Sequence, residues 1–398
     1  MSSMVRKLGF FNFLCFSILI LIVFSYYSVK RFFLLDELFL LDLLMFFYVM
    51  VSVFNYILKN GGLRILRCSL YFIFFLYLAL FPSLFLLVFS RDVVGGSVFI
   101  SQYYFTFTIL PLFFNYLYVN RHVRFFLMVV FWGGVIVCLM YVLILVHPVF
   151  LWSDIFQQSR KISEGIGFGF RFFLGEFTPN EMGHYFVFFL LSFISLVSID
   201  SNNKKIFTIP VVLFTFIMTL SKTVWVQILA SSILIKNKTS ILFFYSLLFF
   251  VVVFLFVFYS DFFVFFARDF STEASSNAKR ISMYYDSILY LPYSILWPAF
   301  HSDVNVVLSG VNVTSVHNGF LSYISNFGLI SFLMLFLSFY GFLFLNLRRS
   351  NFFIFLLIHI DFIVLAFNPM INARHVWLPL FMLVYMFYHL KKFGRSLD

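Results

Sequence analysis

Charge is scarce in this sequence: 27 Lys and Arg and 16 Asp and Glu make up 11% of its 398 residues. A soluble domain carries about 25% charged residues. Apolar side chains take their place, at 63% of the chain, and include 67 phenylalanines. This composition leaves too little polar surface to coat a water-soluble globule. It therefore excludes a soluble enzyme, a secreted disulfide module and a disordered tail.

Cysteine is rare, and the common metal and phosphate motifs are missing. The three cysteines lie in or beside apolar runs and form no CxxC pattern, which argues against structural disulfides and thiolate metal sites. The sequence has no HExxH motif, no two histidines at ligand spacing beside carboxylates, and no glycine-rich phosphate-binding loop. The net charge of +11 does not indicate nucleic-acid binding, because basic residues in a membrane protein mainly report its orientation.

Long apolar runs recur from one end of the chain to the other, and about 20 apolar residues suffice to cross a bilayer. They predict an all-α, polytopic membrane protein with about twelve transmembrane helices in a single integral membrane domain, residues 1–398. The first helix is predicted to be retained rather than cleaved as a signal peptide. The predicted helices are 9–27, 37–57, 66–90, 98–118, 123–146, 179–199, 205–220, 223–236, 240–260, 318–346, 351–368 and 374–390.

The basic residues predict the orientation of these helices. With the N-terminus in the cytoplasm, 16 of the 27 basic residues fall in short cytoplasmic segments, which agrees with the positive-inside rule. Both termini are then cytoplasmic. Two longer segments, 147–178 and 261–316, fall on the extracytoplasmic side. Long loops in a compact fold are usually functional or disordered, so we expect the chemistry on that side.

Ionisable residues within the predicted helices are few, which argues against an ion-coupled transporter. Asp36, Glu37 and Asp42 lie near the start of the second predicted helix, and His359 and Asp361 lie in the eleventh. The extracytoplasmic segments are richer in arginine, lysine and histidine. Arginine binds phosphate through paired N–H donors, and histidine suits a general base near neutrality. The expected ligand is a lipid phosphate or diphosphate, and the alternative is that these arginines only pair with lipid headgroups.

Two local patterns narrow this expectation. Arg171 precedes Gly175 and a Pro179-Asn180 turn that opens a predicted helix. His317 lies where the second long loop enters the bilayer, and Gly328 follows it by eleven positions. Gly328 is expected to let another helix or a lipid chain approach closely. The alternative for His317 is an interfacial residue that caps the helix.

At these residues the chain resembles the O-antigen ligase/polymerase superfamily of bacterial membrane glycosyltransferases. Members have about twelve spans, cytoplasmic termini and a large periplasmic loop before a His-Asn pair, here His317-Asn318. An Arg that opens an amphipathic part of this loop is matched by Arg280. Ser331 departs from a second Gly that the family often has, and Lys222 matches a Ser-Arg pair only loosely. The stretch LPYSILWPAF also lacks the glycines of the family's loop.

The resemblance implies a GT-C-like enzyme of the bacterial inner membrane, with 147–178 and 261–316 as periplasmic loops. It implies glycan transfer from an undecaprenyl-diphosphate donor by inverting displacement, without metal or cofactor. Arg280 and Arg171 would neutralise the diphosphate leaving group, and His317 would take the acceptor's proton. The implied substrate-binding residues are Asn318, Asn180, Lys222 and Arg374. The implied partners are the undecaprenyl-diphosphate-linked oligosaccharide, membrane lipids and a chain-length regulator protein, and no nucleic acid.

Two acceptors are open within this superfamily. A polymerase adds the growing glycan to a new lipid-linked repeat unit, whereas a ligase adds it to lipid A–core. The polymerase is favoured because extreme Phe enrichment and little Ala suggest an AT-rich gene, which the resemblance associates with O-antigen clusters. A third reading, a flippase for lipid-linked sugar, predicts charged residues within the spans and pseudo-symmetric halves. The sequence shows neither, so this reading is disfavoured.

Overall fold

The computed structural model describes the first five helices and shorter parts of the rest of the chain. The described residues are 2–27, 33–35, 38–88, 93–146, 188–189, 192, 306–308, 311–313, 320, 323–324, 327–346 and 377–385. The chain forms two compact units, and each is considered by itself. Unit 1 comprises Met1–Ile22, Phe32–Val123 and Arg280–Asp398, and unit 2 comprises Val23–Arg31 and Arg124–Lys279.

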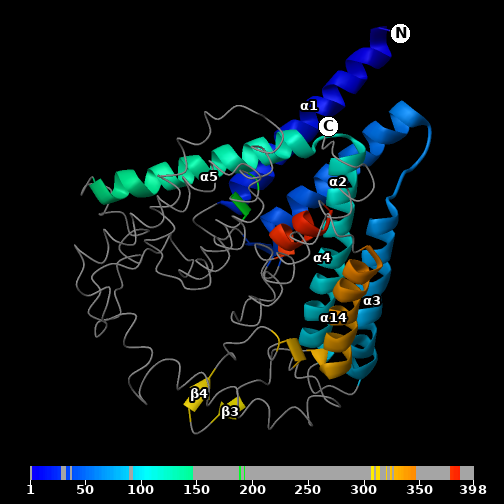
Figure 1. The fold of residues 1–398 in the computed structure, drawn as a ribbon, viewed down its shortest axis with the longest axis vertical. Coiled ribbons are helices and arrows are strands. Elements are labelled where there is room, and N and C mark those ends of the chain that lie inside the picture. Colours follow the sequence, from blue (N-terminus) through cyan, green and yellow to red (C-terminus); the bar gives the residue numbers. More distant parts are fainter. Residues whose placement is uncertain are drawn as a thin grey trace. The chain divides into compact units, whose positions relative to one another are not determined.

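The first five predicted helices are present in the structure (Figure 1). They are α1 (Ser2–Tyr26), α2 (Leu40–Asn60), α3 (Arg67–Leu87), α4 (Val93–Val119) and α5 (Val123–Val146). Three of them, α1, α2 and α3, are long and apolar enough to cross a bilayer, and α4 with α5 meets the same criterion as a pair. The chain is therefore a multi-pass helical membrane protein, with three or four candidate spans among the described residues.

Large apolar side chains cover the outer faces of these helices. Phe13 and Phe24 of α1 are both 70% exposed, and Phe74 of α3 is 64% exposed. A soluble monomer rarely exposes large contiguous apolar patches, whereas lipid tails are a favourable surrounding for such side chains. The exposed phenylalanines thus agree with the low charge of the sequence.

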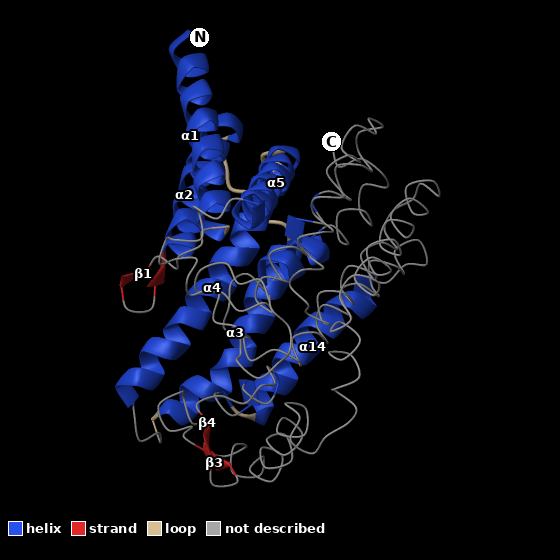
Figure 2. Cartoon of the chain, turned by 90° about the vertical axis from the view of Figure 1, so that its left-hand side faces the viewer, coloured by secondary structure: helices blue, strands red, loops and turns tan. Residues whose placement is uncertain are grey.

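Unit 1 is built around α3, which packs along α4 on one side and along α14 (Leu329–Asn346) on another (Figure 2). Near the end of α3, the Ser83 hydroxyl lies 2.7 Å from that of Ser331 near the start of α14. Near the start of α3, the Tyr71 hydroxyl donates to the carbonyl of Ser338 at 3.1 Å. The two helices therefore run antiparallel.

Aromatic rings fill the centre of unit 1. The ring of Phe72 on α3 lies 5.2 Å from that of Phe339, 4.8 Å from that of Phe342 and 5.5 Å from that of Phe381. Phe381 belongs to helical residues 377–385, a part of the predicted span 374–390, and all nine of these residues are buried. A helix that is apolar all round is expected in the interior. The abundant phenylalanine of this sequence thus serves the core as well as the lipid-facing surface.

One buried polar network joins three segments of unit 1. The Asn115 side-chain oxygen accepts a hydrogen bond from the Leu66 backbone N–H at 2.7 Å and one from the Ser69 hydroxyl at 3.3 Å. The Asn115 amide nitrogen donates to the carbonyl of Arg64 at 3.1 Å. The Ser69 hydroxyl also contacts the hydroxyl of Tyr385. The Tyr385 hydroxyl in turn donates to the carbonyl of Pro111 at 2.7 Å. Because these groups bond to one another, the network fixes α4 against the start of α3 and against residue 385.

Unit 2 contains a close approach to two glycines of α5. A Cβ on Gly134 would lie 2.2 Å from the ring of Phe189, and a Cβ on Gly133 would lie 3.0 Å from Val23. The hydroxyl of Tyr27 donates to the carbonyl of Val130, one turn before these glycines, at 3.1 Å. Because Gly133 and Gly134 have no side chain, aromatic residues can pack directly on the α5 backbone.

Two short hairpins of unit 1 are absent from the sequence-based prediction. β1 (Phe33–Leu35) pairs with β2 (Leu38–Phe39), and β3 (Val306–Leu308) pairs with β4 (Val311–Val313), both antiparallel. Because β2 ends at Phe39, α2 begins at Leu40 and not at the predicted residue 37. The β3–β4 hairpin lies within the predicted loop 261–316, where valines flank a two-residue Ser-Gly connection, a pattern that favours a hairpin.

Candidate functional site

The seven residues predicted from the sequence to form the site lie outside the described residues. They are His317, Arg280, Arg171, Asn318, Asn180, Lys222 and Arg374. Their convergence on one cavity stays a prediction. The described residues that follow the His-Asn pair most closely along the chain are Phe320, Tyr323 and Ile324. These residues and the start of α14 are the part of the candidate region that the structure describes.

The helix predicted as continuous over 318–346 is interrupted at Gly328. This glycine has a φ of +86°, in the left-handed region that residues with a Cβ rarely adopt. Its N–H donates to the carbonyl of Ile324 at 2.7 Å, which closes the preceding turn, and its own carbonyl accepts from Phe332 at 3.2 Å. One helical segment therefore ends at Gly328 and α14 starts anew. The glycine eleven positions after His317 thus marks a helix break, whereas the sequence predicted only a close approach of another helix or a lipid chain.

Ser331 anchors the start of α14 to α3. The Ser83 hydroxyl donates to the carbonyl of Phe327 at 2.7 Å and lies 2.7 Å from the Ser331 hydroxyl. The side chains of both serines are fully buried. Ser83 thereby satisfies a carbonyl next to the Gly328 break and also holds Ser331. The residue that departs from the superfamily pattern is therefore a structural contact in this chain.

Aromatic side chains surround the same helix entry. The ring of Tyr103 on α4 lies 4.5 Å from that of Phe327 and 6.3 Å from that of Tyr323. Tyr323 is fully buried, and within the described part of the chain its hydroxyl has no hydrogen-bond partner. A buried hydroxyl without a partner is unfavourable, so this phenol would gain a hydrogen bond by donating to a polar group that reached it. Sequence reasoning passed over Tyr323 because a tyrosine among aromatic residues gives no pattern of its own.

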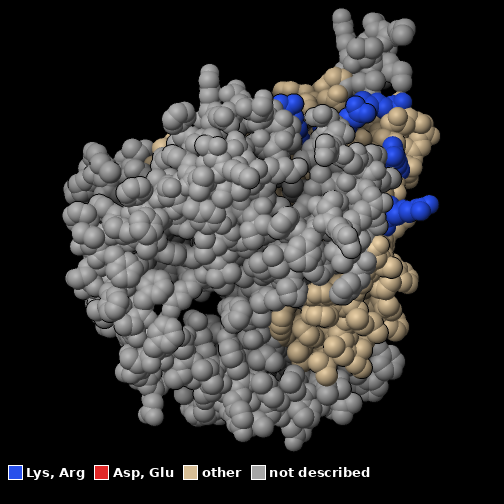
Figure 3. All heavy atoms as spheres, in the orientation of Figure 1, with Lys and Arg blue, Asp and Glu red and all other residues tan. Residues whose placement is uncertain are grey.

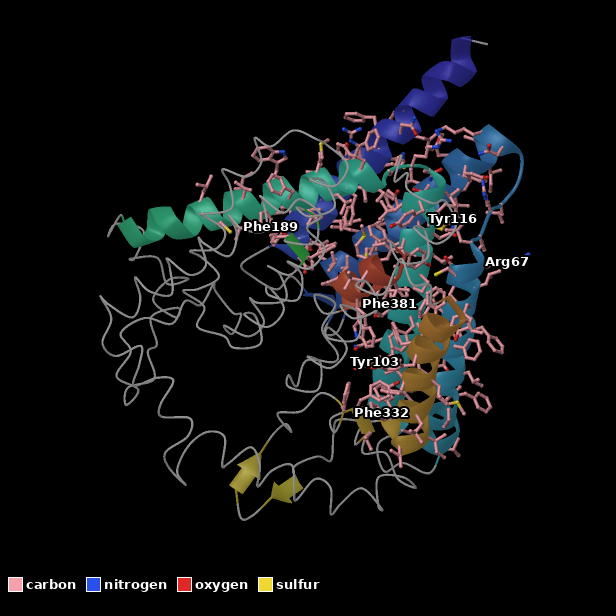
Figure 4. The ribbon with its side chains drawn as sticks, viewed as in Figure 1. Arg67, Tyr103, Tyr116, Phe189, Phe332 and Phe381 are labelled. Atoms are coloured by element: carbon pink, nitrogen blue, oxygen red, sulfur yellow. The ribbon has the colours of Figure 1, made fainter. Side chains whose placement is uncertain are left out.

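Unit 1 has two ends of different chemistry. Exposed basic side chains lie where α2 ends, α3 begins and α4 ends (Figure 3). We call the four that belong to unit 1, Lys59, Arg64, Arg67 and Arg121, the basic end. The start of α14 lies at the opposite end of α3, and Figure 4 shows Tyr103 and Phe332 at that end, Arg67 and Tyr116 at the basic end, and Phe381 between them.

His122 is a buried titratable group at the basic end, in the turn between α4 and α5. Its Nδ1 lies 3.0 Å from the hydroxyl of Tyr48, and its ring lies 4.9 Å from that of Phe16. Burial, with a smaller effect of the positive charge of Lys59, lowers the pKa of His122 from 6.5 to about 4. The imidazole is therefore neutral at physiological pH. Because both partners are far from His122 along the chain, no local sequence pattern indicates this contact.

The low pKa of His122 predicts a pH dependence of stability. Because the unfolded chain binds this proton near pH 6.5 and the folded chain only near pH 4, stability is fully present above about pH 6.5 and falls as the pH drops toward 4. The loss should reach about 3 kcal/mol at the acid limit. Thermal unfolding in detergent at several pH values measures it. His122→Gln should lose this part of the pH dependence, and an identical dependence in both proteins would contradict the assignment.

The cysteines and the possible metal ligands can be placed for the part of the chain that the structure describes. Among those residues, no three His, Cys, Asp or Glu side chains gather in a way that could hold a metal ion. Cys15, Cys68 and Cys138 are all buried.

Comparisons of the chain with protein families, with curated proteins and with solved structures find no match.

Proposed function

We propose that this chain is a membrane glycosyltransferase that joins undecaprenyl-diphosphate-linked oligosaccharide repeat units at the extracytoplasmic face of the membrane. The observation that carries the proposal is the antiparallel packing of α14 on α3. Because of this packing, α14, the helix that follows the His-Asn pair, begins at the end of α3 opposite to the basic end. The spacing from His317 to the left-handed Gly328 is the second support.

The orientation follows from the basic end. Short loops rich in Lys and Arg stay in the cytoplasm, so we assign the basic end to the cytoplasmic face. The start of α14 then faces the outside. Phe320 packs on Phe332 of α14, with ring centroids 5.2 Å apart, and His317 precedes Phe320 by three residues. Three residues of chain span at most about 11 Å, so we expect the imidazole near the outer entry of this helix.

The proposed reaction is a single displacement at the anomeric carbon of the donor glycan. The acceptor hydroxyl oxygen forms the new bond from the face opposite to the diphosphate, and the bond to the diphosphate breaks with its electron pair. His317 takes the hydroxyl proton. Arg280 and Arg171 neutralise the negative charge that develops on the leaving diphosphate, a task that suits the paired donors of a guanidinium group. Asn318, Asn180, Lys222 and Arg374 are the proposed contacts to sugar and diphosphate.

A defined-substrate assay tests this proposal. Purified protein in liposomes receives only undecaprenyl-diphosphate-linked repeat units, and the products are separated by glycan length. A polymerase makes a ladder of longer lipid-linked chains. Extension only after lipid A–core is added would establish the ligase instead. Movement of unextended donor across the bilayer without any transfer would establish the flippase, and it would overturn the proposed chemistry.

A further inference from the structure

The end of α4 is closed by an arginine in a position that usually belongs to glycine. Arg121 has a φ of +60°, and it is the one residue other than glycine with positive φ in the described part of the chain. The His122 N–H donates to the carbonyl of Leu117 at 2.8 Å, and the Arg121 N–H donates to that of Tyr118 at 3.2 Å. These two bonds define a Schellman cap, with Arg121 as its left-handed residue. A side chain with a Cβ is disfavoured in this conformation.

The chain uses glycine for the same purpose elsewhere. Gly61 has a φ of +70° directly after α2, and its N–H donates to the carbonyl of Ile57 at 2.8 Å. Gly328 closes the helical turn before α14 in the same conformation. An arginine in the third such position therefore carries a conformational cost that glycine would remove. Backbone strain of this kind clusters at functional sites, where the surrounding structure holds it.

Three other basic side chains share this end of unit 1. Lys59, Arg64 and Arg67 are exposed, as is Arg121, and they come from the end of α2, the following loop and the start of α3. Asn115 ties the backbone of Arg64 to α4, and Lys59 lies close enough to His122 to influence its pKa. The one acidic side chain among the described residues, Asp42, lies in the first turn of α2, at the other end of that helix. The basic end is thus positively charged without local compensation by a described acid.

We propose that the basic end binds the phosphate of an anionic phospholipid in the leaflet that it faces, with Arg121 as the principal ligand. Position and charge both fit this occupant, because the four side chains lie at the ends of apolar helices, where headgroups are found. The planar guanidinium group offers two parallel N–H donors to a phosphodiester, which a lysine cannot copy. This binding site is independent of the sugar-transfer reaction.

The competing explanation is the dipole of α4. Positive side chains near a helix C-terminus are stabilising without any ligand. That effect needs a charge but no forked geometry and no lipid. Three substitutions at one position separate the two accounts. Arg121→Lys keeps the charge and the strain, Arg121→Gln keeps the strain alone, and Arg121→Gly removes both.

The experiment measures the unfolding midpoint of each purified protein in detergent, titrated with phosphatidylglycerol or with phosphatidylcholine. Phosphatidylglycerol should raise the midpoint of the wild type, and phosphatidylcholine should not. Arg121→Gln and Arg121→Gly should weaken the apparent affinity for phosphatidylglycerol about tenfold, which corresponds to the loss of a charge-assisted hydrogen bond. Arg121→Lys should fall between these variants and the wild type. Without anionic lipid, Arg121→Gly should unfold at a higher temperature than Arg121→Gln, because its backbone strain is relieved.

Three outcomes would overturn the proposal. The first is an unchanged response of Arg121→Gly to phosphatidylglycerol, which would leave the dipole as the role of this charge. The second is an equal response of the wild type to phosphatidylcholine. The third is an equal stabilisation by inorganic phosphate at the same concentration, which would show anion binding without a lipid.

Discussion

Replacing His317 with alanine is expected to abolish glycan extension by the purified protein while leaving its amount in the membrane unchanged. A general base contributes about 10²- to 10⁴-fold to the rate. Loss of the imidazole leaves the acceptor hydroxyl without a group to take its proton, although the arginines can still hold the diphosphate. The ladder of lipid-linked products from defined repeat units measures the loss. Donor binding should persist, because no proposed diphosphate contact is removed.

The matched control is His301→Ala. His301 lies in the predicted loop 261–316, which ends directly before His317, and it has no role in the proposed reaction. Its replacement should leave the ladder unchanged. If His317→Ala extends chains at the wild-type rate, His317 has no part in the mechanism. If both variants lose activity and protein together, the loop histidines are structural.

Asn115→Ala is expected to destabilise unit 1 strongly, because it dismantles a buried polar network. The substitution removes an acceptor from the buried Leu66 N–H and the buried Ser69 hydroxyl, and a donor from the part-buried Arg64 carbonyl. A buried group left without a partner costs about 1–3 kcal/mol. Two such groups, partly relieved by rearrangement, should lower the free energy of unfolding by about 2–4 kcal/mol. Denaturant unfolding in detergent measures the change.

Asn60→Ala provides the comparison for Asn115→Ala. The side chain of Asn60 is exposed and donates only to the carbonyl of Tyr56 in its own helix, at 3.1 Å. Water replaces that bond when the side chain is removed, so the stability should change by less than about 0.5 kcal/mol. Equal effects of the two substitutions would show that the network around Asn115 does not hold α4 to α3.

The sequence predicted the first five helices closely because the bilayer imposes a simple requirement on them. Each span needs a long apolar run with its backbone hydrogen bonds satisfied internally. The runs at 123–146 and 66–90 correspond closely to α5 and α3 for this reason. A helix break inside such a run has no hydropathic signal. The sequence therefore predicts only a packing role for Gly328, whereas the structure shows its φ of +86°.

The polar contacts of the fold could not be predicted, because they join residues that are far apart along the chain. His122 and Tyr48 are 74 positions apart, and Ser69 and Tyr385 are 316 positions apart. Asn115 looked like an isolated polar residue in an apolar run, and its partners belong to the loop and helix start at 64–69. The candidate site rests on short motifs in sequence order, and its seven residues stay predictions because they lie outside the described residues.

The orientation of the two ends of unit 1 connects the structure to the proposed chemistry, and cysteine labelling measures it directly. The native cysteines are buried, with exposures of 0% for Cys15, 1% for Cys68 and 0% for Cys138, so a membrane-impermeant maleimide should not react with them. In intact spheroplasts, Asn318→Cys should be labelled, and Asn60→Cys at the basic end should be labelled only after the membrane is permeabilised. Labelling of Asn60→Cys in intact spheroplasts, with Asn318→Cys protected until permeabilisation, would contradict the account.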